Sequence, residues 1–347
     1  MRRPQHCWAS NNKFRGTMTF TQENSIDSAS RALLRTITCS ELQNEVPRAL
    51  GELLHAATED GIFYLKFDDG DKRNWSRSIE GVDRLSRDIF DLSTKEKLLF
   101  DIDSMGKLKL NGYKPIGRNK GGIDGHRDGF ESYAISQNTI NMMPGLAVRH
   151  PGVVYKHQEA LTQLTSNCLD MTQLVFKALS RAFGLPADDS FESRHHESAT
   201  SSLDLLRLLK YPNAMGDGEF SIPQLAHADM GSLTFLFTSS PGLQILPPGT
   251  ESWRNVLPMP GHAIVNFGDA IKILSGGRIE SVIHRVVTMP EKQVRDRYSF
   301  AFLVRPGVSA HISTLASFAG QESENGMASP MTCEEWVSMR FSQLRAK

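Results

Sequence analysis

Two histidines and one aspartate in the second half of the chain could together hold a transition metal. His227 and Asp229 lie two residues apart, and His284 follows much later. Two imidazoles and one carboxylate can occupy one face of a metal ion and leave the opposite positions open, which suits Fe(II) oxygenase chemistry. The alternative is three unrelated residues, because His-x-Asp is a common pair and the chain contains 11 histidines.

Arg297 and Ser299 form a second candidate pair, suited to holding a ligand carboxylate. A guanidinium is the best two-pronged partner for a carboxylate. Residues two apart on a strand share a face, so the Ser299 hydroxyl can donate a second hydrogen bond beside Arg297. A surface salt bridge is the alternative for an arginine near the start of a strand.

The elements that position these residues are expected to be short strands. From residue 204 onward, apolar runs alternate with turn residues such as Pro241-Gly242 and Gly276-Gly277. Runs of this length and spacing are typical of a sandwich or jelly roll. On one strand, His227 and Asp229 would face the same side, and a distant strand would bring His284 beside them. We expect strands over residues 205–211, 232–237, 243–246, 262–267, 281–287 and 298–304.

The first half of the chain is expected to be mainly helical. Its apolar periodicity predicts strands at 34–38 and 61–67 and helices over 41–58, 78–90 and 155–184. The glycine-rich basic segment 111–125 lacks a phosphate-binding motif, which favours a solvated loop. Near the end of the chain, Thr332 and Glu335 form a possible capping box for a helix that reaches Leu344.

Composition indicates a small-molecule partner. Lysine and arginine number 39 and so do aspartate and glutamate, so no net charge suggests nucleic acid or an anionic membrane. The four widely spaced cysteines support neither a disulfide framework nor a zinc cluster. The chain has no apolar run of the roughly 18 to 20 residues that a membrane span needs. We expect a soluble, cytoplasmic protein, monomeric or weakly homo-oligomeric.

The first 30 residues are polar and lack hydrophobic periodicity, which predicts a disordered tail. Four basic residues and no acidic residue precede Glu23, so a weak mitochondrial transit signal stays an alternative. A start at Met18 is another, and the sequence leaves open whether residues 1–17 belong to the native protein.

Five motifs follow one another between residues 204 and 306. After His227-x-Asp229 come Gly242-Leu243-Gln244-Ile245, Val265-Asn266-Phe267-Gly268-Asp269, His284-Arg285-Val286-Val287 and Arg297-Tyr298-Ser299. Their order and spacing resemble the catalytic domain of the isopenicillin N synthase-like branch of the Fe(II)/2-oxoglutarate-dependent dioxygenases. Two departures are Leu34–Thr38 in place of the family's usual opening strand, and Lys210 where tyrosine is common.

The resemblance implies a fold that is mainly β with flanking helices around a double-stranded β-helix (jelly roll, cupin-like) core. It implies Fe(II) bound by His227, Asp229 and His284. It further implies 2-oxoglutarate and O2 as cosubstrates, with ascorbate as a candidate reductant. The residues that would hold 2-oxoglutarate are Arg297, Ser299 and Tyr211.

The implied activity is oxidation of a small organic molecule, by hydroxylation, desaturation, ring closure or ring expansion. The resemblance to fungal members suggests an intermediate of secondary-metabolite biosynthesis, of unspecified identity. Three alternatives stay open: an Fe(II) oxidase of the same fold that does not use 2-oxoglutarate, a catalytically silent metabolite-binding jelly roll, and a zinc hydrolase. The last lacks a glutamate base placed by any motif.

Strand periodicity adds two candidate substrate residues, Arg207 and Leu303, on the faces of Tyr211 and Arg297 respectively. His262 is expected to be structural rather than a ligand. We expect four segments: a disordered tail (1–30), a helical N-terminal region (31–200), the catalytic jelly roll (201–310), and a C-terminal loop and helix over the pocket (311–347).

Overall fold

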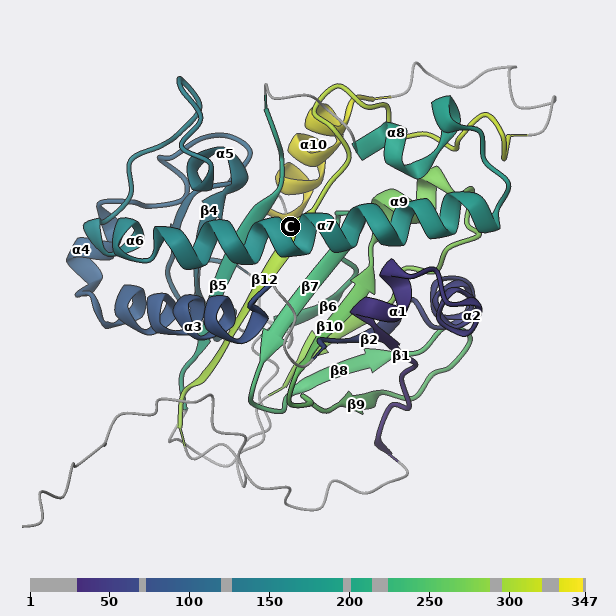
Figure 1. The fold of residues 1–347 in the computed structure, drawn as a ribbon. Helices are drawn as coiled ribbons and strands as arrows, with labels where there is room; N and C mark the ends of the chain where they lie inside the picture. Colours follow the sequence, from purple (N-terminus) through teal and green to yellow (C-terminus); the bar gives the residue numbers. More distant parts are fainter. Residues whose placement is uncertain are drawn as a thin grey trace, which may run out of the picture.

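Two β-sheets packed against each other form the centre of the molecule (Figure 1). The computed structural model describes residues 30–68, 73–119, 127–195, 201–213, 224–287, 295–319 and 331–345. Apolar side chains from the inward faces of both sheets meet in one cluster, which includes Tyr64, Ile264 and Ile245. This is the expected jelly-roll core with flanking helices.

The large sheet has eight strands and the small sheet four among the described residues. In spatial order the large sheet consists of β1 (Thr36–Thr38), β2 (Ile62–Lys66), β10 (His262–Phe267), β7 (Leu233–Thr238), β12 (Arg297–Val304), β5 (Leu205–Tyr211), β4 (Glu131–Ser136) and β3 (Gly112–Lys114). The small sheet consists of β6 (Gln224–His227), β11 (Ile283–Val286), β8 (Leu243–Leu246) and β9 (Arg254–Val256).

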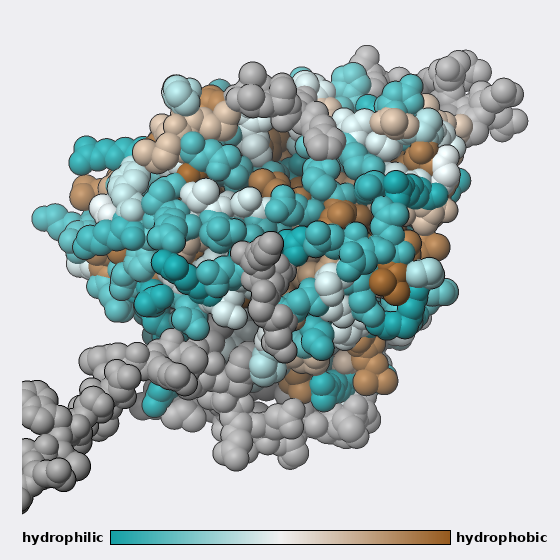
Figure 2. Space-filling model, viewed as in Figure 1, coloured by the Kyte–Doolittle hydropathy of each residue, from teal (hydrophilic) through white to brown (hydrophobic). Residues whose placement is uncertain are grey.

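Helices cover the outer face of the large sheet, and Figure 1 shows the long helix α7 running across it. The solvent side of this helical layer is mostly hydrophilic (Figure 2), as expected for amphipathic helices on a core. The described α-helices are α1 (Cys39–Gln43), α2 (Pro47–His55), α3 (Trp75–Asp91), α4 (Thr94–Leu98), α5 (Gln137–Ile140), α6 (Gly152–Lys156), α7 (Gln158–Ala182), α8 (Phe191–His195), α9 (Asp269–Leu274) and α10 (Cys333–Arg345), and a π-helical turn (Ala56–Asp60) continues α2.

Alternation along two central strands separates the core from the site. On β12, Phe300 and Phe302 point outward into the cluster shared with α3 and α7. Arg297, Ser299 and Leu303 take the opposite, inward face, because side chains alternate along a strand. β5 pairs with β12 so that Tyr211 lies opposite Arg297 and Arg207 lies opposite Ala301. The sheet therefore gathers polar residues on its inward face.

Several expected elements match the structure closely. The strands over 205–211, 243–246 and 262–267 have the expected bounds, and the capping box is present, with the Glu335 amide donating to Thr332 Oγ1 and the Thr332 amide donating to Glu335 Oε2. The expected helix over 41–58 is broken, because α1 ends at Gln43 and α2 begins with Pro47. The expected helix over 155–184 is split at His157 into α6 and α7.

The expectation of a solvated loop over 111–125 is wrong for its first part. Tyr113 and Lys114 belong to β3 and are buried. The Lys114 ammonium is compensated by Asp128 and by the Phe130 carbonyl, which allows a charged residue to be buried here. Strand β4 beside it was also missed, and all six of its residues are buried. Residues 120–126, like the expected tail before Ser30, lie outside the described residues.

Within the described ranges, no helix is both long enough and apolar enough to cross a membrane. Cys39, Cys168 and Cys333 are buried as thiols in the apolar core.

Candidate metal centre

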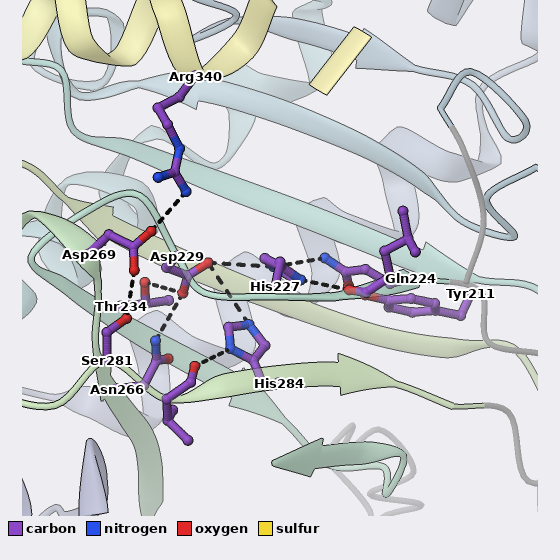
Figure 3. A network of polar contacts seen from close by, with 12 residues as sticks. Tyr211, Gln224, His227, Asp229, Thr234, Asn266, Asp269, Ser281, His284 and Arg340 are labelled. Atoms are coloured by element: carbon purple, nitrogen blue, oxygen red, sulfur yellow. Dashed lines mark hydrogen bonds and ion pairs between the residues drawn. The ribbon is translucent and has the colours of Figure 1, made fainter. Parts of the chain in front are cut away.

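His227, Asp229 and His284 converge at one edge of the space between the two sheets (Figure 3). One ligand atom from each residue lies within 4.8 Å of the other two. The Nε2 atoms of His227 and His284 are 3.7 and 3.9 Å from the same atom, Asp229 Oδ1. About 31% of the His227 side chain is accessible, so the cluster can be reached from outside.

Hydrogen bonds orient each of the three ligand atoms. Nδ1 of His227 lies 2.8 Å from the Leu225 carbonyl oxygen, which makes Nδ1 the protonated nitrogen and leaves the Nε2 lone pair for another partner. His284 has the same arrangement with the Val282 carbonyl oxygen, at 3.3 Å.

The Asp229 carboxylate is held by one oxygen only. Thr234 Oγ1 donates to Asp229 Oδ2 at 2.6 Å, and Asn266 Nδ2 donates to the same oxygen at 3.0 Å. Oδ1 is the oxygen that faces the two imidazoles. Outer hydrogen bonds of this kind commonly fix the orientation of metal ligands.

The protonation states suit a metal. Burial, together with the neighbouring His284, lowers the pKa of His227 to about 4. Burial opposes ionisation of Asp229, but the two histidines and the hydrogen bonds from Asn266 and Thr234 lower its pKa to about 2. At neutral pH the cluster therefore offers a neutral His227 and an ionised Asp229, the forms that bind metals.

Strand pairing and a tight turn position the triad. His284 on β11 is the direct cross-strand partner of His227 on β6, and their rings lie 4.4 Å apart. Asp229 is not on the same strand as His227, contrary to expectation, because β6 ends at His227. Its backbone carbonyl instead accepts from the Asp269 amide at the start of α9.

Two glycines permit this turn. A Cβ atom on Gly231 would lie 2.4 Å from the Val304 carbonyl oxygen, and one on Gly268 would lie 2.6 Å from the Asp229 carbonyl oxygen. Only a residue without a side chain allows the backbones to approach so closely. These contacts explain why glycine occupies positions 231 and 268.

Arg297 forms the second polar cluster, on the inward face of β12. The side chain is 3% exposed, its Nε donates to the Pro241 carbonyl at 2.9 Å, and its Nη1 donates to Ser299 Oγ at 3.1 Å. The guanidinium lies 5.0 Å from the centre of the Tyr211 ring. Nη2 is buried and has no hydrogen-bond partner within the part of the chain that the structure describes. A buried, unsatisfied cationic donor fits an anionic ligand.

The comparisons with known proteins give the family. Residues 203–306 match the model of the 2OG-Fe(II) oxygenase superfamily. A 2-oxoglutarate-dependent dioxygenase of Gibberella zeae is 31% identical over 79% of this chain and 80% of its own length. One of Glarea lozoyensis is 31% identical over 92% of this chain and 90% of its own length. This chain belongs to the Fe(II)/2-oxoglutarate-dependent dioxygenases.

Solved structures share the fold of the dioxygenase. A full-length Neurospora crassa protein in complex with alpha-KG superposes with a TM-score of 0.73, at 22% identity, over 92% of this chain and 98% of its own. JOX2 in complex with 2OG, Fe and JA superposes with a TM-score of 0.68, at 20% identity, over 92% of this chain and 88% of its own. The dioxygenase therefore uses Fe(II), 2-oxoglutarate and O2.

The other expected site residues of the dioxygenase differ in how they relate to the triad. The Tyr211 hydroxyl donates to Gln224 Oε1, and the Gln224 amide lies 3.4 Å from Nε2 of His227, so Tyr211 is linked to the triad (Figure 3). Arg207 is half-buried and electrostatically coupled to Asp229. Leu303 packs with the apolar residues beside it. His262 is not in the cluster, and its Nδ1 bonds to the Pro260 carbonyl.

Three residues of the dioxygenase site were not expected to act there. Gln224, Thr234 and Asn266 all bond to members of the triad or to Tyr211. Asn266 was visible as part of a motif, but nothing in the sequence says that its amide reaches Asp229 across two strands. Gln224 and Thr234 carry no sequence signal of their own.

Proposed function

We propose that His227, Asp229 and His284 hold the Fe(II) of this dioxygenase. The observation that carries the proposal is that one ring nitrogen of each histidine and one carboxylate oxygen lie within 4.8 Å of one another. Their nitrogen and oxygen donor set suits Fe(II). The second carboxylate oxygen is engaged by Thr234 and Asn266, which supports a single-oxygen role for Asp229.

Arg297, Ser299 and Tyr211 are proposed to hold the distal carboxylate of 2-oxoglutarate. The buried Nη2 of Arg297 supports this, because it would gain a charge-assisted hydrogen bond from such a ligand. Ser299 restrains the guanidinium through Nη1, and the Tyr211 ring packs beside it. Burial of the pair excludes water, which strengthens its attraction for a carboxylate.

Fe(II) held by these residues would activate O2, the oxidant that is consumed as 2-oxoglutarate is converted to succinate and CO2 and a substrate C–H bond is oxidised. The protein residues contribute orientation: carbonyl groups fix the two imidazoles, and Thr234 and Asn266 fix Asp229. We propose hydroxylation, desaturation, ring closure or ring expansion as the outcome.

The proposed substrate is a small organic intermediate of secondary metabolism, and Arg207 and Leu303 are proposed to line its site. Support comes from fungal relatives named as 2-oxoglutarate-dependent dioxygenases, including one of Aspergillus rugulosus that is 31% identical over 75% of this chain.

We also propose that the chain is organised in the four expected segments, 1–30, 31–200, 201–310 and 311–347. The C-terminal segment is tied to the site, because Arg340 on α10 pairs with Asp269, whose other oxygen accepts from Ser281 (Figure 3). Trp336 and Val337 of α10 pack in a cluster that also includes Met230, the residue after Asp229. Both contacts support a C-terminal helix beside the pocket.

The test measures anaerobic binding of Fe(II), then of 2-oxoglutarate, by calorimetry, followed by succinate release in air with and without ascorbate. We expect one Fe(II) per chain, 2-oxoglutarate binding that requires the metal, and slow succinate release that candidate substrates accelerate. Oxidation of a substrate without succinate formation would favour an oxidase that does not use 2-oxoglutarate. Absence of iron binding at micromolar concentration would overturn the proposed ligand set.

A further inference from the structure

Arg207 is a second inward-facing arginine, separate from Arg297. It lies on β5, on the same face as Tyr211, and its direct neighbours on the flanking strands are Ala134 of β4 and Ala301 of β12. Both are alanines, so the long arginine side chain stands between two short ones. The guanidinium therefore meets no bulky side chain from its paired neighbours on the sheet.

The Arg207 guanidinium lacks a dedicated partner. No hydrogen bond or ion pair joins it to any residue in the described ranges, and its Nε atom is buried without a hydrogen-bond partner. Burial lowers its pKa, whereas Asp229 and Tyr211 raise it. A half-buried cation with an unsatisfied buried donor carries a desolvation cost that a bound anion would offset.

The nearby anion and cations are already engaged. Asp229 is bound by Thr234 and Asn266 and faces the two histidines. Lys114, whose pKa is lowered mainly by burial and to a smaller extent by Arg207, is held by Asp128 and the Phe130 carbonyl. Arg305 donates from Nη1 to the Leu203 carbonyl at 2.7 Å. The Nε atom of Arg305 is also buried without a hydrogen-bond partner, but Arg207 differs from Lys114 and Arg305 in having no hydrogen bond to any described residue.

Its position separates Arg207 from the proposed cosubstrate site. Arg297 lies opposite Tyr211 in the sheet, whereas Arg207 lies opposite Ala301, four residues further along β12. Four residues of strand correspond to roughly 13 Å. The backbone positions of the two arginines therefore lie at different levels of the sheet, although both side chains are electrostatically coupled to Tyr211. A single five-carbon diacid anchored at Arg297 would leave Arg207 for another anion.

The surroundings of Arg207 also have an apolar side. Ala134 and Ala301 belong to a cluster with Leu205, Leu303 and Ile102, against which Leu110 and Leu236 pack. A ligand that pairs with Arg207 would place its remaining atoms near this apolar wall and near Asp229. One lone guanidinium matches one negative charge, and its planar fork matches a carboxylate better than a phosphate dianion, which would need a second cation.

We propose that Arg207 binds a carboxylate of the substrate, and that the substrate is a monocarboxylic acid with an apolar body. This inference rests on the proposed function, because it places the acid beside the proposed iron ligands. Arg207 is then a specificity residue that selects the ionised acid over its neutral amide.

The test uses matched pairs of probes: alkyl and aryl carboxylic acids of six to twelve carbons, each with its primary amide. Binding to the protein loaded with Fe(II) and 2-oxoglutarate is measured anaerobically by calorimetry for the wild type, Arg207→Gln and Arg207→Lys. The control is Arg87→Gln, which removes one positive charge from the exposed side of α3. Acid-stimulated succinate release in air gives a second readout.

We expect at least one acid to bind about 30-fold or more tightly than its amide, because a desolvated charge pair is lost in the amide. Arg207→Gln should weaken acid binding by about the same factor, Arg207→Lys by less, and Arg87→Gln not at all. The affinity for 2-oxoglutarate should stay within about threefold of the wild type in all three variants, because Arg207 is separate from Arg297 at the proposed cosubstrate site. A threefold change in affinity corresponds to less than about 1 kcal/mol.

Three results would overturn the inference: amides that bind as tightly as acids, Arg207→Gln that keeps wild-type affinity for the acids, or no acid of the panel binding below millimolar concentration. Loss of 2-oxoglutarate binding in Arg207→Gln would assign Arg207 to the cosubstrate instead, and would leave the proposed function intact. Failure of the wild type to bind Fe(II) or 2-oxoglutarate would defeat the proposed function itself.

Discussion

Two histidine clusters in this protein share a low pKa but differ in how their polar atoms are used. Burial lowers the pKa of His150 to about 4, and the pKa of His227 is also about 4. His150 is 2% exposed and both of its ring nitrogens are engaged: the Tyr133 hydroxyl lies 2.8 Å from Nδ1, and Asn111 Oδ1 lies 3.1 Å from Nε2.

Both ring nitrogens of His150 are used in hydrogen bonds, whereas the Nε2 atoms of the triad point toward a shared carboxylate oxygen without bonding to it. Asn111 Oδ1 can only accept, so Nε2 of His150 donates to it and Nδ1 accepts from Tyr133. In the triad, the Nε2 atoms of two histidines face one carboxylate oxygen at 3.7 and 3.9 Å, beyond hydrogen-bond length. A low histidine pKa is therefore common to both clusters, and the convergence of two imidazole nitrogens on one carboxylate oxygen distinguishes the candidate ligand site from the structural network.

The largest effect is expected from Asp229→Ala. Removal of the carboxylate leaves two histidines without the third ligand, so we expect loss of iron binding at micromolar concentration and loss of succinate release. Asp269→Asn is the matched control, because this carboxylate contacts Ser281 and Arg340 rather than the histidines. Calorimetry with Fe(II) and circular dichroism of both variants check the result. Normal turnover by folded Asp229→Ala would exclude the proposed ligand set.

Arg297→Gln should raise the dissociation constant for 2-oxoglutarate by about 30-fold or more, because a buried charge pair is lost. Iron affinity should change little. Arg297→Lys should be intermediate, since lysine lacks the two-pronged geometry. Arg285→Gln serves as control, because Arg285 stacks on Trp253 and bonds to Gln244. If Arg297→Gln binds 2-oxoglutarate like the wild type, the cosubstrate is held elsewhere.

Thr234→Val tests the outer hydrogen bond to Asp229. Loss of the hydroxyl should weaken iron binding by about 10- to 100-fold, the usual effect of removing such a partner. The control is Thr172→Val in α7, where the buried hydroxyl bonds to the Cys168 carbonyl within the helix. The comparison of Fe(II) affinity in the two variants is the measurement, and equal affinities would mean that the Thr234 hydroxyl is not needed to orient Asp229.

The smallest effect on activity is expected from His150→Gln, in the cluster that His150 forms with Tyr133 and Asn111. His150 has a folded-state pKa below that of an exposed histidine, so the unfolded chain binds a proton first as the pH falls. The contribution of His150 is complete above about pH 6.5 and is lost as the pH falls toward about 4, by about 3 kcal/mol at most. Urea unfolding from pH 7 to pH 4.5 should show a weaker pH dependence for His150→Gln than for the wild type. Iron affinity at pH 7 should be equal in the two proteins, and an unchanged pH dependence of stability would contradict the assignment.

Much of the fold was predictable because the strands of the catalytic half follow simple alternation. Apolar runs bounded by turn residues predicted the strands β5 and β12, and the alternation of side chains along a strand predicted the shared face of Arg297 and Ser299. The buried strand β4 was not predictable, since all six of its residues are buried and include polar ones. Burial of Lys114 depends on Asp128 and a backbone carbonyl, which no local pattern announces.

The sequence by itself determined the family chemistry of this protein: a set of ligand types in a fixed order, held by motifs whose glycines, at Gly231 and Gly268, allow close backbone contacts. Only the tertiary structure decided which oxygen of Asp229 faces the histidines, that Gln224 joins Tyr211 to His227, and that Arg207 stands without a partner between two alanines. The physical reason is that ligand identity is a local property of residue type. The satisfaction of a buried polar atom instead depends on strands that pairing brings together from distant parts of the chain.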